Sequence, residues 1–74
     1  MIDTLSLIRE GNVFHLQLSG MLEKEKAAKL AEALEGDGLS PDIDALSHHR
    51  RTPISAVGLI QPQTARTIIE ILAS

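Results

Sequence analysis

The stretch TLSLIREGNVFHLQLS, residues 4–19, decides the fold because its apolar and polar side chains alternate on both sides of one turn signal. The apolar residues that recur with a period of two are Leu5, Leu7, Phe14, Leu16 and Leu18. A period of two is typical of a strand with one buried face. The dipeptide Gly11-Asn12 between the two runs tolerates the positive φ of a tight reversal. The stretch therefore predicts an antiparallel β-hairpin.

The second face of this hairpin is predicted to be in contact with water. Its polar side chains are Thr4, Ser6, His15 and Gln17. Ile8 is an apolar exception on the same face. Antiparallel sheets commonly pack one face on the core and leave the other solvated. We therefore expect the rest of the chain to cover one side of the hairpin.

The segment 23–35 changes to a helical period and predicts an amphipathic helix. Its apolar residues at positions i, i+3, i+4 and i+7 are Ala27, Leu30, Ala31 and Leu34. Lysines and glutamates occupy the remaining sides. Gly36 follows at a position where a left-handed residue commonly ends a helix.

A second, short helix is predicted after Ser40-Pro41-Asp42, which combines an N-cap side chain, a first-turn proline and a first-turn acid. Ile43 and Leu46 would form its apolar side. The polar run that follows has no periodicity, and Pro53 disfavours helix at the residue before it. We therefore expect one or two helical turns and then a flexible loop over residues 47–53.

Two further elements follow this loop. Residues 54–60, ISAVGLI, are nearly all apolar, which is typical of a strand that is covered on both faces or lies inside a sheet. Residues 62–72 begin with a proline and continue with a helical apolar stripe, formed by Ala65, Ile68, Ile69 and Leu72. The β-branched residues in this segment would favour a strand, whereas their spacing favours a helix. We predict a helix.

Together these elements predict one α+β domain over residues 1–74. A small three-stranded sheet, made of the N-terminal hairpin and one later strand, is packed by two amphipathic helices. The expected order is β-β-α-(short α)-β-α. The chain contains 11 Leu, 8 Ile and 2 Val, which suffices for a single small core.

Composition excludes several classes of function. The chain has no cysteine, which rules out disulfides, cysteine-ligated zinc and a thiol nucleophile. Phe14 is the single aromatic residue, which argues against a base-stacking surface for single-stranded nucleic acid. Neither a signal peptide nor an apolar run near the ~20 residues of a membrane span is present. We therefore expect a cytoplasmic protein without a membrane contact.

The sequence also lacks a constellation typical of an enzyme. Asp42 and Asp44 are two residues apart and would face different sides of a helix, so they do not form an acid/base pair. His48 and His49 are adjacent and would point apart, and His15 lies on the outer face of the hairpin, whereas a metal site needs converging ligands. We expect no catalysis, metal, cofactor or small-molecule substrate.

Two features remain as candidate binding sites. The run His48-His49-Arg50-Arg51 is a local basic segment on a chain with a net charge of -3, and its guanidinium groups could bind phosphate or carboxylate. A solvated linker loop is the alternative for this run. Ile71 widens the apolar stripe of the last helix, either as a broad core contact or as a partner surface.

From these features we expect a non-catalytic module for protein–protein interaction or self-association. The alternative is a small regulator that contacts nucleic acid or another polyanion through the loop at residues 48–51. A sequence pI near 5.4 weighs against nucleic acid as the partner.

Overall fold

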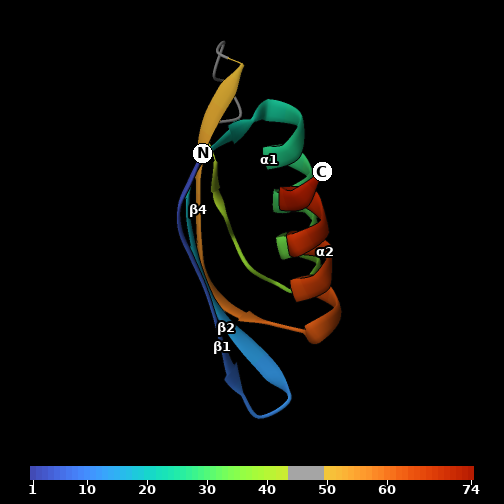
Figure 1. Ribbon diagram of the computed structural model, residues 1–74. Coiled ribbons are helices and arrows are strands. Elements are labelled where there is room, and N and C mark those ends of the chain that lie inside the picture. Colours follow the sequence, from blue (N-terminus) through green and yellow to red (C-terminus); the bar gives the residue numbers. More distant parts are fainter. Residues whose placement is uncertain (44–49) are drawn as a thin grey trace.

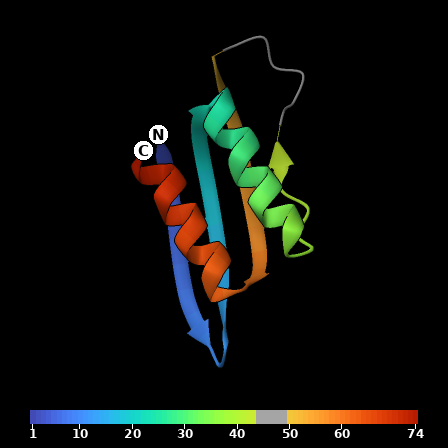
Figure 2. The same ribbon diagram turned by 90° about the vertical axis from the view of Figure 1, so that its right-hand side faces the viewer.

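The computed structural model describes residues 1–43 and 50–74 of the chain. In these ranges a four-stranded antiparallel sheet carries two helices on one face (Figures 1 and 2). The elements are β1 (Ile2–Glu10), β2 (Val13–Glu23), α1 (Lys24–Gly36), β3 (Asp42–Ile43), β4 (Arg51–Ile60) and α2 (Pro62–Ala73). The strand order is β1-β2-β4-β3. The α+β prediction is confirmed, with four strands rather than three.

The predicted hairpin is formed by β1 and β2. Glu10 lies opposite Val13, and Gly11 has a φ of 65° at the first central position of the turn, which is typical of a type II′ turn. The register shifts between Ile2 and Thr4, which marks a bulge in β1. A Cβ atom at Gly20 would lie 2.6 Å from the carbonyl oxygen of Met1, so the strands approach too closely there for any other residue.

The predicted start of the last strand is wrong by three residues. β4 begins at Arg51, so residues 51–53 of the predicted loop form part of the sheet. Thr52 lies opposite Leu22 of β2, and its side chain is fully buried. Pairing with the long strand β2 therefore outweighs the local signal of the proline at residue 53. Residues 47–49 of the predicted loop lie outside the described residues.

The predicted short helix after Ser40 is also wrong where the structure describes it. Asp42 and Ile43 form β3, in which Ile43 lies opposite Ile54 of β4. Ile43 is partly buried and packs against the core. A β-branched side chain fits this position at a sheet edge, and tertiary pairing overrides the capping motif. Residues 44–46 lie outside the described residues.

The core lies between the sheet and the helices. In Figure 2, α2 crosses β1 and β2, while α1 lies beside it toward β4. The predicted stripe of α1 is confirmed as its buried side. The fully buried large aliphatic residues are Leu16, Leu18, Leu30, Leu34, Ile54, Ile60 and Ile68. Burying each such side chain contributes about 1.5–3 kcal/mol, so this layer supplies most of the driving force for folding.

The helix α1 ends in a Schellman motif. Gly38, with a φ of 87°, is the left-handed residue, so the prediction of Gly36 is wrong. The Gly38 N–H donates to the Glu35 carbonyl at 3.0 Å, and the Leu39 N–H donates to the Leu34 carbonyl at 3.1 Å. The left-handed residue comes two positions later than predicted because the motif then places Leu39 against the core.

Two residues at the end of α1 make contacts with distant parts of the chain. Leu39 packs against β4, and Asp37 binds the residue before α2. A Cβ atom at Gly58 of β4 would lie 2.9 Å from the Leu39 Cγ, so the Leu39 side chain packs directly against the backbone of Gly58. The Gln61 N–H, just before α2, donates to the Asp37 carboxylate at 2.9 Å. A carboxylate at this place also interacts favourably with the helix dipole of α2.

Candidate functional site

One face of the sheet has no cover in the part of the chain that the structure describes. Figure 1 views the sheet nearly edge-on, with α1 and α2 on the same side. We call the opposite side the open face. Because side chains alternate along a strand, every second residue of β1, β2 and β4 points to it. The apolar residues on this face are Ile8, Val13, Met21, Pro53, Val57 and Leu59.

Four of these residues form an aliphatic patch, defined here as Ile8, Val13, Val57 and Leu59. The strand register places Ile8 opposite His15, and His15 opposite Leu59 on its other side. The imidazole of His15 therefore stands among aliphatic neighbours. Ile8 is 58%, Val57 65% and Leu59 53% exposed, which is unusual for large aliphatic residues that are neighbours on one surface.

Charged residues lie around the patch and not within it. Glu10 is next to the hairpin turn, and Glu23 lies opposite Arg51 at the far end of the sheet. Asp42 is on the edge formed by β3. Asp3, at the bulge of β1, lines a hollow with Asp42 and Ser55. The other residues between these positions, which include the aliphatic patch, are uncharged side chains and His15. The central part of the open face is thus suited to contact with another uncharged surface.

The strand β4 is apolar on both of its faces. Its sequence predicts a strand inside a sheet or covered on both faces, and β4 does lie between β2 and β3. Ile54, Ala56 and Ile60 are buried on the helix side. Val57 and Leu59, on the other side, are more than half exposed. The described residues therefore cover only one of the two apolar faces of this strand.

The sequence contained a signal for this surface that our site prediction did not use. Ile8 was the apolar exception on the polar side of the hairpin, and the run at residues 54–60 was apolar at nearly every position. The predicted binding residues did not include Ile8, Val57 or Leu59. Their association becomes visible only with the register, which places β4 next to β2.

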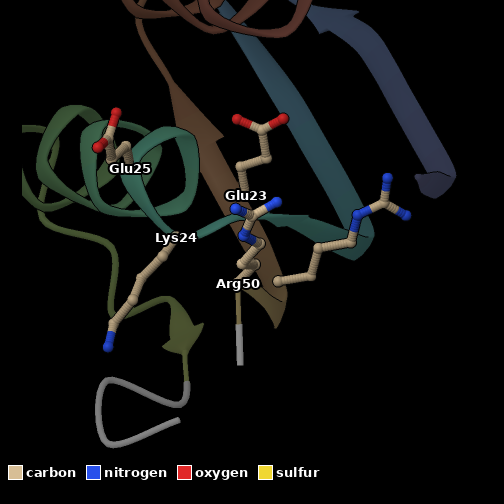
Figure 3. Close-up of a pocket in the computed structure, with 5 residues that line it drawn as sticks. Glu23, Lys24, Glu25 and Arg50 are labelled. Atoms are coloured by element: carbon tan, nitrogen blue, oxygen red, sulfur yellow. The ribbon is translucent and has the colours of Figure 1, made fainter. Parts of the chain in front are cut away.

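The predicted basic site is described only in part. Arg50 and Arg51 are exposed and line a hollow of about 430 Å³ together with Glu23, Lys24 and Glu25 (Figure 3). The Lys24 side chain points away from the guanidinium group of Arg50 in Figure 3. Two carboxylates therefore accompany the cationic groups of this hollow, and the Lys24 and Arg50 side chains do not converge. His48 and His49 lie outside the described residues.

The second predicted site residue, Ile71, faces the neighbouring helix. It is partly buried against the core and lines the groove between α1 and α2, together with Thr64 and Thr67. This position agrees with the broad core contact, and a role of Ile71 in binding stays a prediction. Ile69 is instead the exposed isoleucine of α2, at 51%.

Other classes of site find little support in the described ranges 1–43 and 50–74. These residues contain no group of three or more histidine and carboxylate side chains that could hold a metal ion. Neither of the two helices there has the length and apolarity that a bilayer span requires. Comparison with protein families, curated proteins and solved structures finds no significant match for this chain.

Proposed function

We propose that the protein is a non-catalytic interaction module that self-associates by packing the open faces of two copies together. The observation that supports this proposal is the apolar run of β4, of which the helices cover one side only. A second copy would provide the missing cover for Val57 and Leu59. The aliphatic patch would then lie between two sheets, as the inner residues of a β-sandwich do.

A second copy suits this face because the face is uncharged at its centre. In a two-fold dimer the same patch serves both partners, so it must be complementary to itself. Aliphatic side chains meet this condition, since they interact with one another without opposite charges. A partner with a charged surface would leave its own charges desolvated against Val57 and Leu59.

The size of the face also agrees with a dimer. The strands β1, β2 and β4 contain 9, 11 and 10 residues. At ~3.3 Å per residue and ~4.8 Å between strands, the face measures about 30 Å by 14 Å, or roughly 400 Å² in projection. Two such faces with their side-chain relief bury more than about 800 Å², which approaches the ~1,200 Å² of small stable interfaces. We therefore expect a dimer that dissociates on dilution.

Light scattering or sedimentation at several concentrations tests this proposal. The mass should rise above the 8.0 kDa of one chain as concentration increases. The variant Val57→Lys should weaken this association at least tenfold, because it would bury an ammonium group against the aliphatic patch of the other copy. The control Gln63→Lys places the same charge on an exposed residue of α2 and should leave the association unchanged.

Two results would contradict the proposal. One is a wild-type protein that stays at the monomer mass at the highest concentration reached. The other is a Val57→Lys variant that associates at its open face as strongly as the Gln63→Lys control.

A further inference from the structure

The strand β1 forms one edge of the sheet, and no strand pairs with its outer side in the described structure. It is nine residues long, whereas β3 at the opposite edge has two residues. An edge strand exposes backbone N–H and C=O groups that can bind a further strand. Of the two edges, β1 is therefore the one with enough length to pair.

The usual protection of an edge strand is missing from the middle of β1. Natural edges commonly carry lysines, prolines, inward charges or bulges that prevent pairing. Residues 4–8, TLSLI, include none of the charged residues and no proline. The bulge lies between Ile2 and Thr4, so it leaves the remainder of the strand regular. This regular part is free to pair along its outer side.

Apolar side chains flank this edge on both faces of the sheet. Leu5 is 43% exposed on the helix side, and Ile8 is exposed on the open face. Thr67 and Ile71 face α1. Ile69 is two residues away from each of them, which places its side chain about 200° around the axis of α2. Ile69 therefore lies on the outer flank of α2, which crosses over β1 in Figure 2. A strand added at this edge would cover these side chains.

We propose that the edge strand β1 pairs in antiparallel fashion with β1 of a second copy, in the register centred on Ser6. This register places Leu5 opposite Leu7 of the second copy on the helix side, and Thr4 opposite Ile8 of the second copy on the open face. Two leucines from each chain then meet beneath the two α2 helices. The pairing adds main-chain hydrogen bonds to this apolar contact.

The apolar centre of the strand favours a second copy over an unrelated strand. Residues 4–8 carry no charge, and their Leu5 and Leu7 side chains lie on the same side of the sheet. Because the contact has two-fold symmetry, the contact between Leu5 and Leu7 occurs twice. The strand is therefore complementary to itself in its apolar centre. An extended peptide from another protein would need to reproduce this arrangement.

This contact is independent of the open-face contact proposed above. Antiparallel pairing at an edge has its two-fold axis perpendicular to the sheet, whereas face-to-face packing has its axis in the plane between the sheets. Two perpendicular two-fold axes produce a closed tetramer. It would consist of two continuous sheets packed face to face, with all the helices outside.

The experiment measures two properties of four proteins at high concentration: their mass and the hydrogen exchange of the β1 amides. The proteins are the wild type, two single variants and the double variant. The wild type should reach four times the mass of one chain, and its mass should fall on dilution. Leu5→Lys and Val57→Lys should each form no more than a dimer, with twice the mass of one chain. The double variant should remain monomeric. Alternate amides of β1 donate to β2, and the others face outward. The outward-facing amides should be protected in the Val57→Lys dimer and unprotected in the Leu5→Lys dimer, because only the former keeps the edge contact.

Ile69→Lys provides a second edge variant if Leu5→Lys fails to fold, since Ile69 is 51% exposed on the helix side and does not lie on the open face. A monomeric Val57→Lys protein with unprotected outward-facing β1 amides would overturn the edge proposal and leave the proposed function intact. A monomeric Leu5→Lys or Ile69→Lys protein beside a dimeric Val57→Lys protein would support the edge contact and contradict the open-face contact. A wild-type dimer whose outward-facing β1 amides exchange freely would also overturn the edge proposal.

Discussion

The two faces of β4 carry similar aliphatic side chains and have opposite environments. Ile54 and Ile60 are almost fully buried beneath the helices, whereas Val57 and Leu59 are more than half exposed on the open face. The first pair can stabilise the monomer, because its cover belongs to the same chain. The second pair adds little to the monomer and would stabilise the contact between two copies that we propose. The comparison shows that similar side chains on one strand differ in their contribution to the core according to which face of the strand carries them.

The largest expected difference between these faces concerns the stability of the monomer. Ile54→Ala should lower the free energy of unfolding by about 2–5 kcal/mol, because it leaves a cavity in a packed core. Val57→Ala should lower it by less than about 1 kcal/mol, since this side chain is 65% exposed. Urea denaturation at a concentration where the protein is monomeric measures both values. Equal losses would mean that the chain itself covers the open face.

A smaller effect is expected where the helix side of β4 meets Leu39. Gly58 has a φ of 154°, and an added Cβ atom would lie 2.9 Å from the Leu39 Cγ. Gly58→Ala should therefore lower the unfolding free energy by about 1–3 kcal/mol through strain and overpacking.

Gly36 provides the matched control for this substitution. It lies in the last turn of α1, and an added Cβ atom would meet no atom within 4 Å. Gly36→Ala should leave stability unchanged or raise it by up to about 1 kcal/mol, because alanine has the higher helix propensity. Thermal unfolding of both variants tests the pair. A Gly58→Ala protein as stable as the control would show that Leu39 moves aside without cost.

The smallest expected effect concerns Arg50 and Arg51, which are exposed and lie outside the core. Replacing both by alanine should change the unfolding free energy by less than about 0.5 kcal/mol and leave the mass unchanged. Because Glu23 and Glu25 line the same hollow, we also expect no chemical-shift change at residues 50–51 when a duplex oligonucleotide is added at physiological salt. Binding that weakens steeply with salt would instead favour the polyanion alternative.

Much of this protein was predictable from local patterns in its sequence. The alternation along residues 4–19 predicted the hairpin, and the helical stripes of segments 23–35 and 62–72 predicted α1 and α2. Such periods arise because a strand or helix buries one side whatever the final fold is. The apolar exception Ile8 and the nearly continuous apolar run at residues 54–60 were also visible. They were signals of an apolar surface on the second side of the sheet, but our prediction placed that side in contact with water and did not use them.

The tertiary structure decided the features that depend on contacts between distant residues. Ser40-Pro41-Asp42 indicated a helix, yet Ile43 pairs with Ile54 in β3 because the sheet edge offers a better place for it. The neighbouring strand β2 likewise extends β4 back to Arg51, through a proline that locally indicated a loop. The exposure of Val57 and Leu59 has no signal within the run at residues 54–60 itself. It depends on how the chain crosses the sheet, because either face of β4 is apolar enough to be covered.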